Sequence, residues 1–206
     1  MIDFLAVFIT FFAVIDPIGT VPVFIAVTRK YDKATKRRIA LYATIVAAGV
    51  LLFFLVIGEV ILKALSIPLP AFQISGGIVL FLFALNMIFG DSKPEEEIKL
   101  VKDSHKDTAI FPIAVPSIAG PGAMLAAVLL TENSVVPVMQ QVQTALVMLS
   151  VLLIVYILML LSEFITRFIG TSGASVISRV MGLILSAIAT TNILTGIREY
   201  YQYIQL

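Results

Sequence analysis

Few residues of this chain could do chemistry, and most of the usual catalytic sets are missing. The 206 residues include no cysteine and a single histidine, His105. Thiol catalysis, disulfides and cysteine or histidine metal clusters are therefore excluded, and Ser117 has no plausible histidine base inside its apolar stretch. The sequence also has no Walker loop, dinucleotide fingerprint or HExxH motif. We expect a protein that is not an enzyme and needs no cofactor and no metal.

Asp16 is the residue with the strongest chemical signal. It is the only ionisable residue near the middle of any long apolar stretch. A charge at the centre of a membrane span costs about 2.5–3.5 kcal/mol on insertion scales, and such residues usually have a function. Asp16 is therefore a candidate proton-coupling group or a ligand for an ammonium ion. Capping the helix that follows is the other role open to it, and one residue can do both.

Two proline- and glycine-rich sequences interrupt apolar stretches, and five of the nine prolines lie in these stretches. Proline suits the first position of a helix, and Asp and Gly are acceptable caps before it. Asp16-Pro17 and Gly120-Pro121 therefore each predict the start of a second half-helix near the bilayer centre. Free N–H groups and the positive dipole end would attract an anion there, such as a substrate carboxylate. Unwound carbonyls and Asp16 would hold an ammonium. Proline kinks that only bend the helices are the alternative.

Two asparagines in other apolar stretches, Asn86 and Asn192, either line a pathway or hydrogen-bond between helices. With them, the candidate substrate-binding residues are Asp16, Pro17, Ile18, Gly19, Thr20, Asn86, Ser117, Gly120, Pro121, Gly122, Ala123 and Asn192.

The elements that position these residues are membrane spans. Hydrophobic residues make up 60% of the chain, against roughly 45–50% in soluble domains, and charged residues only 13%. Lipid is therefore the expected solvent. The N-terminal stretch lacks the basic start of a signal peptide, so we count it as a span. Six stretches are long enough to cross a bilayer, which takes about 20 residues: 2–28, 39–62, 69–90, 109–131, 142–163 and 176–197.

The basic residues predict an orientation. Twelve of the 14 lysines and arginines fall in the first, third and fifth connections or, for Arg179, just after the fifth, and only Lys63 and Arg198 lie on the other side. Basic loops face the cytoplasm, so both termini should lie outside a multi-pass cell (inner) membrane protein. A net charge of +1 implies no nucleic-acid partner. The sequence carries no signal for an oligomeric state.

The two halves of the chain repeat a pattern. The matched residues are Gly76, Asn86 and Gly90 with Gly182, Asn192 and Gly196 at an offset of 106, and Pro17, Glu59 and Lys63 with Pro121, Glu163 and Arg167 at an offset of 104. Three spans per copy make the copies inverted, a plan typical of secondary transporters. Chance similarity among apolar helices is the alternative.

We therefore predict an all-α membrane protein with six transmembrane helices in two inverted three-helix repeats, with spans 1 and 4 broken near the midplane. Residues 1–206 form one transmembrane domain: repeat 1 at 1–90, a cytoplasmic loop at 91–108 and repeat 2 at 109–206. Glu59–Lys63 and Glu163–Arg167 should form ion pairs near span ends. Glycines such as Gly76, Gly77 and Gly182 should allow close helix contact.

These residues resemble those of a known family. Asp16-Pro17-Ile18-Gly19, Gly120-Pro121-Gly122-Ala123 and Gly76-Gly77-Ile78 are similar to sequences of the MarC family, also called the small neutral amino acid transporter family. The resemblance covers essentially the whole chain, although many members carry Asn at the position of Asp16. It implies proton-linked transport of glycine, alanine and similar amino acids, by export or uptake.

Three functions follow as hypotheses. The first is a secondary transporter of small neutral amino acids, driven by a gradient because no ATP site is present. The second is a channel or passive facilitator for small solutes, and the third is a membrane scaffold that transports nothing. Apart from the substrate, the expected partner is the lipid bilayer.

Overall fold

The chain folds into helices alone within the residues that the structure, a computed structural model, describes: 3–89, 105–131 and 136–204. The side chains of a few residues in these ranges, Arg167 among them, are not described. The elements are α1 (Phe4–Ile15), α2 (Pro17–Thr28), α3 (Lys33–Ala64), α4 (Leu69–Phe89), α6 (His105–Thr108), the π-helical segment η1 (Ala109–Ile118), α7 (Pro121–Leu129), α8 (Val138–Leu160) and α9 (Ser162–Ile204).

Within the described residues, five apolar segments are long enough to cross a membrane, and a bent pair of helices makes a sixth if it is counted as one span. The five are Phe4–Thr28, which joins α1 to α2, together with α3, α4, α8 and the Arg179–Tyr203 part of α9. The sixth is the pair η1 and α7, whose axes differ by 56° across a short break. The prediction of an all-helical membrane protein is therefore confirmed. Most of the predicted loop at 91–108 lies outside the described residues.

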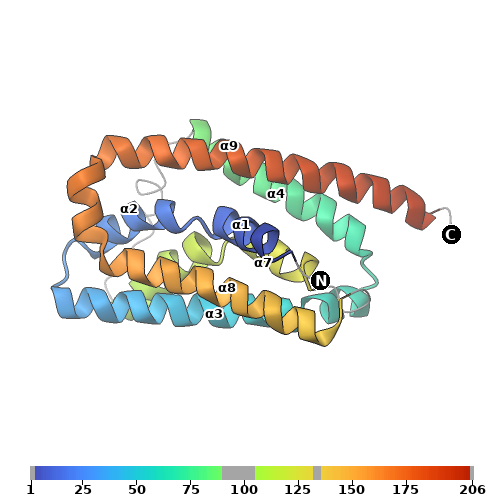
Figure 1. Cartoon of the computed structure of the whole chain (residues 1–206), viewed down its shortest axis with the longest axis horizontal. Coiled ribbons are helices and arrows are strands. Elements are labelled where there is room, and N and C mark those ends of the chain that lie inside the picture. The colour runs from blue at the N-terminus through green and yellow to red at the C-terminus, as the bar shows by residue number, and fades with distance from the viewer. Residues whose placement is uncertain (1–2, 90–104, 132–135, 205–206) are drawn as a thin grey trace.

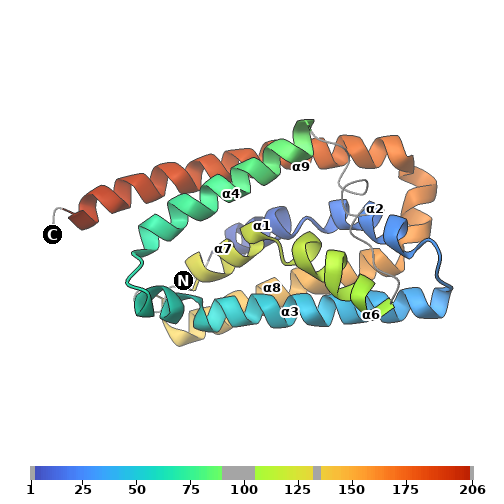
Figure 2. The ribbon, with the colours of Figure 1, turned by 180° about the vertical axis from the view of Figure 1, so that it is seen from behind.

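The helices form two outer pairs with a central set between them (Figures 1 and 2). On one side α3 packs against α8, and on the other α4 packs against α9. Between them, α1 and α2 contact α8 and α9, while η1 and α7 contact α3. The first of these five crossings is the most enclosed. Of its most apolar 18-residue stretch 56% is buried inside the protein, against 22–33% of the corresponding stretch in the other four. The first interrupted stretch thus lies in the interior.

Two helices are longer than the sequence predicted. Asp32 caps α3 by accepting a hydrogen bond from the Ala34 amide at 3.2 Å, so the helix begins at Lys33 rather than at residue 39. Its 32 residues span about 48 Å, more than the roughly 30 Å hydrocarbon core, so polar turns project from the bilayer. The predicted connection between residues 163 and 176 is also helical, because α9 begins at Ser162 and includes these residues.

Glycines set the spacing between α4 and its neighbours. A Cβ on Gly77 would lie 3.2 Å from the Ala189 carbonyl oxygen of α9. A Cβ on Gly182 of α9 would lie 3.0 Å from the Ala84 carbonyl oxygen of α4. Both distances are tighter than ordinary contact, so the backbones can approach this closely only without side chains at these positions. The predicted role of these glycines is confirmed.

The segment before α7 is more irregular than predicted. Besides the break at Ala119 and Gly120, Phe111 and Val115 have extended backbone angles inside η1. Each precedes a proline, and proline pushes the residue before it out of the α region. The sequence predicted the start of a half-helix at Gly120-Pro121 but did not predict these two distortions before it.

Candidate functional site

The first break is built around Asp16. The residue is 1% exposed and has left-handed backbone angles, φ 52° and ψ 67°. Its N–H donates to the Phe12 carbonyl, which ends α1. Its Oδ1 accepts a hydrogen bond from the Gly19 amide at 2.9 Å, which starts α2 with Pro17 at the first position. The predicted cap is confirmed, and a single residue serves both helix ends.

The neighbours of Asp16 fit closely around its carboxylate. A Cβ on Gly19 would collide with the Asp16 carboxylate, so only glycine leaves space for this cap. Thr20 is fully buried and donates its hydroxyl to the Asp16 carbonyl at 3.0 Å. Pro17 is buried and Ile18 is half-buried. The whole motif therefore lies in the interior.

The second break lies at Gly120. This residue is buried, has extended angles and precedes α7, again with a proline at the first helical position. A Cβ here would lie 2.9 Å from the Pro116 carbonyl oxygen, so a side chain would strain the turn. Ser117 is 4% exposed and Ala123 is fully buried, whereas Pro121 is exposed. No side chain caps α7, so its first amides are left to other acceptors.

The two breaks lie at comparable positions in their apolar segments. Twelve helical residues lie on each side of Asp16. The second break follows the 10 residues of η1 and precedes the 9 residues of α7. The half-helices contact each other crosswise, α1 against α7 and α2 against η1. Each break therefore divides its apolar segment near the middle, and the two interrupted segments pack together.

Some predicted site residues lie elsewhere. Asn86 is exposed on α4 and Asn192 is half-buried on α9, and neither makes a hydrogen bond within the described part of the chain. Gly122 packs against Leu80 of α4, while Leu125 of α7 packs against Gly76. Gly122 thus allows a close helix contact. Residues 16–20 lie at the first break and residues 117, 120 and 123 at the second, whereas the two asparagines lie on the outer pair of α4 and α9.

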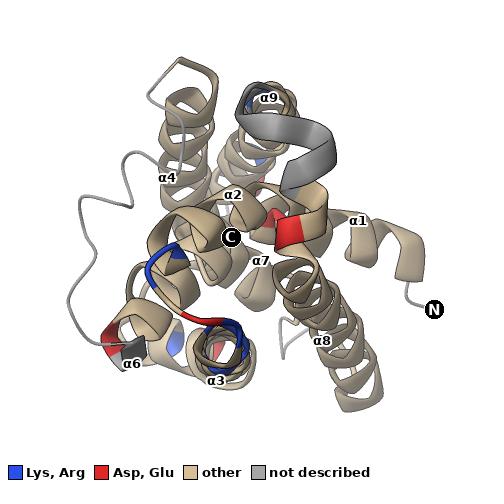
Figure 3. Cartoon of the chain, turned by 90° about the vertical axis from the view of Figure 1, so that its left-hand side faces the viewer, with Lys and Arg blue, Asp and Glu red and all other residues tan. Residues whose placement is uncertain are grey.

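Charged residues form a second feature, at one end of the molecule (Figure 3). The predicted Glu163–Arg167 pair involves the Arg167 side chain, which lies outside what the structure describes. The Glu163 carboxylate pairs with Lys36 at 3.1 Å and Lys33 at 3.8 Å. The hydrogen bond and charge of Lys36, then the charge of Lys33, lower the pKa of the Glu163 carboxyl. At the opposite end the predicted Glu59–Lys63 ion pair is confirmed.

Sequence reasoning missed this charged cluster because it considered for Glu163 only a partner four positions away, whereas Lys36 is 127 positions away. It also missed Thr131, a buried residue just after α7 whose hydroxyl donates to the Leu55 carbonyl of α3 at 3.1 Å. Among the described residues, no group of three or more acidic, histidine or cysteine side chains could hold a metal ion.

Comparison with known proteins gives one consistent result. The model of the family described as MarC family integral membrane protein matches residues 1–201. A UPF0056 membrane protein of Methanocaldococcus jannaschii is 37% identical over 201 residues, covering 95% of this chain and 96% of that relative. The UPF0056 membrane protein YvbG of Bacillus subtilis is 33% identical over 201 residues, covering 95% and 94%. No solved structure matches the chain.

Proposed function

Because the chain belongs to the MarC family of integral membrane proteins, we propose that it is a secondary transporter of small neutral amino acids such as glycine and alanine. Transport is proton-linked and runs as export or uptake according to the gradients, and the proposal includes no enzyme activity. The observation that carries it is the pair of mid-segment helix breaks, whose half-helices contact each other crosswise, with Asp16 buried at the first break.

The proposal includes the inverted repeat, with spans 1 and 4 broken near the midplane. The crosswise contacts of α1 with α7 and of α2 with η1 support it. A two-fold axis in the membrane plane would place α1 onto η1 and α2 onto α7, so it would turn one of these contacts into the other. Transporters built this way hold substrate at the repeat interface, where helix N-termini face anionic groups. Asp16-Pro17 and Gly120-Pro121 are the matching sequences on the two sides of that interface.

The recognition chemistry suits a zwitterion. The N-termini of α2 and α7 carry partial positive charge for the substrate carboxylate. Asp16 and the carbonyls at the breaks would hold the ammonium, since a carboxylate can accept several hydrogen bonds. Small buried residues next to the breaks, such as Gly120 and Ala123, would admit only a small side chain. Asp16 is also the proposed proton-coupling group.

The proposed orientation places the basic end in the cytoplasm and both termini outside the inner membrane. Lys33, Lys36 and Arg37 begin α3 at that end, where the positive-inside rule puts them on the cytoplasmic side.

Counterflow in proteoliposomes tests the function. Vesicles loaded with unlabelled glycine or alanine should accumulate the labelled amino acid, and a pH gradient should change its rate. Asp16→Asn and Pro121→Ala should abolish exchange, because one removes the ionisable group and the other the fixed helix start. Gly49→Ala is the matched control, since no atom beyond the adjoining backbone of its own helix lies within 4 Å of the added methyl.

Two results would reject the proposal. Flux without saturation or counterflow would indicate a passive pore. Normal exchange in both Asp16→Asn and Pro121→Ala would exclude the breaks as the substrate site. Each variant must elute as a single species in detergent, so that a lost activity is not a lost fold.

A further inference from the structure

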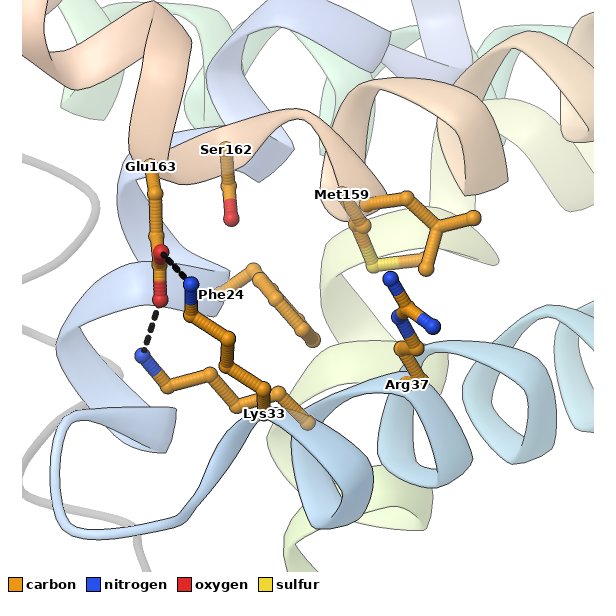
Figure 4. A pocket seen from close by; sticks show the side chains of 8 residues that line it. Phe24, Lys33, Arg37, Met159, Ser162 and Glu163 are labelled. Carbon is orange, nitrogen blue, oxygen red and sulfur yellow. Dashed lines mark hydrogen bonds and ion pairs between the residues drawn. The ribbon is translucent and has the colours of Figure 1, made fainter.

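A pocket of about 130 Å³ lies where four helix ends meet at the charged end of the molecule. The end of α2, the start of α3, the end of α8 and the start of α9 surround it (Figure 4). Its lining includes three cations, Lys33, Lys36 and Arg37, and one carboxylate, Glu163. The pocket is thus positively charged, and it does not include the helix breaks.

The positive charge is only partly neutralised within the protein. Glu163 pairs with both lysines, at 3.1 Å and 3.8 Å. Arg37 makes no hydrogen bond or ion pair with any side chain or backbone group that the structure describes. Its guanidinium lies beside Met159 on the pocket wall (Figure 4). A guanidinium offers several donors in a planar fork that fits two oxygens of a phosphate.

The surroundings of the pocket place it at a membrane surface. Apolar span α8 ends at Leu160 and α3 begins at Lys33, so the pocket lies where the chain leaves the hydrocarbon. Leu160, which lines the pocket, is 40% exposed, and Leu161 and Phe164, which follow it in the chain, are 50% and 63% exposed. A lipid offers both a phosphate for the cations and acyl chains for these side chains. Basic pockets between transmembrane helices are known sites for anionic lipid headgroups.

We propose that this pocket binds the phosphate of an anionic phospholipid from the leaflet at the basic end, with Arg37 as its main ligand. The lysines add charge while Glu163 fixes their position. The acyl chains run along the exposed face of α8. The proposal needs only that the chain spans a membrane, so it stands or falls independently of amino acid transport.

Lipid binding to the purified, delipidated full chain tests the site. Phosphatidylglycerol should raise the unfolding temperature in neutral detergent, whereas phosphatidylcholine should not. Native mass spectrometry should show a bound phosphatidylglycerol. Arg37→Gln should weaken this binding about tenfold or more, since a hydrogen bond to a charged group is lost. Arg37→Lys should bind phosphatidylglycerol more weakly than wild type and more tightly than Arg37→Gln, because it keeps the charge without the planar fork.

The neighbouring arginine provides the control. Arg38 is exposed on the same helix turn but does not line the pocket, so Arg38→Gln removes the same charge and should bind like wild type. Equal losses in both variants would show general attraction to anionic lipid and overturn the site. Arg37-dependent stabilisation by inorganic phosphate alone would assign the pocket to a soluble anion. If Arg37→Gln does not fold, Arg37→Lys takes its place, and the site predicts that Arg37→Lys loses more phosphatidylglycerol binding than Arg38→Gln.

Discussion

At the scale of single residues, Asp16 allows one position to end a helix and start another. Left-handed backbone is unfavourable for most side chains, but Asp and Asn tolerate it because their short polar groups bond locally. Here the carboxylate bonds the Gly19 amide and the backbone N–H bonds the Phe12 carbonyl. The chain therefore crosses from α1 to α2 without a loop.

Two substitutions of Asp16 should distinguish its role as a helix cap from the role of its charge. Asp16→Ala should lose about 1–2 kcal/mol of stability through the missing cap, with a further cost for left-handed backbone. Asp16→Asn should unfold close to wild type, because the amide oxygen still caps α2. Thermal unfolding in detergent checks both variants. An Asp16→Ala protein as stable as wild type would contradict the capping role.

The stability contributed by Glu163 should depend on pH. Its pKa is lower in the folded protein, so the pairing is complete above roughly pH 5 and is lost as the pH falls through the lowered pKa. Wild type should therefore unfold at a higher temperature than Glu163→Gln at pH 7, and the gap should close as the pH approaches 3. In a Lys36→Gln background the gap should already be small at pH 7. A gap that does not change with pH would exclude the ion pair as its cause.

Rules that depend only on neighbouring residues predicted the helix caps at the breaks at Asp16 and Gly120, but not the lysines that pair with Glu163. The proline rule acts over one or two residues, so Asp16 and Gly120 could be identified from the sequence. Lys36 lies 127 positions from Glu163 and meets it only because α3 and α9 begin at the same end. An i,i+4 pattern cannot contain that information.

At the scale of helices, glycine contacts hold α4 against α9. Gly182→Ala should destabilise the protein by about 1–3 kcal/mol, because the new methyl presses on the Ala84 carbonyl, which a rotamer change cannot move. Gly49→Ala should be neutral or slightly stabilising, because its methyl meets no atom within 4 Å beyond the adjoining backbone of its own helix and alanine favours helix. Unfolding temperatures in one detergent provide the comparison. Equal destabilisation of both variants would mean that helix contact is not the cause.

The sequence predicted which segments are apolar better than where helices end. Residues 164–175 are polar enough to suggest a connection, yet they continue α9, because a helix that leaves the bilayer need not stop there. In η1 the two internal prolines change the backbone before each of them. The prediction considered only the glycine-flanked proline, so it missed the distortion at Phe111 and Val115.

At the scale of the whole molecule, the central position of the first crossing explains its composition. A span surrounded by helices can carry Asp16 because its carboxylate meets protein groups rather than lipid. Hydropathy predicted the apolar segments, since each has to match the membrane thickness. It could not predict that α1 and α2 would lie inside and α4 and α9 outside, because all of these segments are similarly apolar.

Cysteine labelling should test the proposed orientation, since the native chain has no cysteine. Leu65→Cys, at the exposed end of α3, should react with an impermeant maleimide in intact cells. Arg29→Cys, at the basic end, should react only after the membrane is permeabilised. Labelling of Arg29→Cys alone in intact cells would reverse the topology.

The contact between α4 and α9 also has a consequence for synthesis. Gly77 meets Ala189 and Ile193, which leave the ribosome more than a hundred residues later. At about 5–20 residues per second, α4 waits on the order of ten seconds for its partner. During that time its glycine face must rest against lipid, the insertion machinery or a temporary neighbour. A ribosome stalled before residue 182 would therefore leave a nascent chain whose third crossing cannot yet be secured.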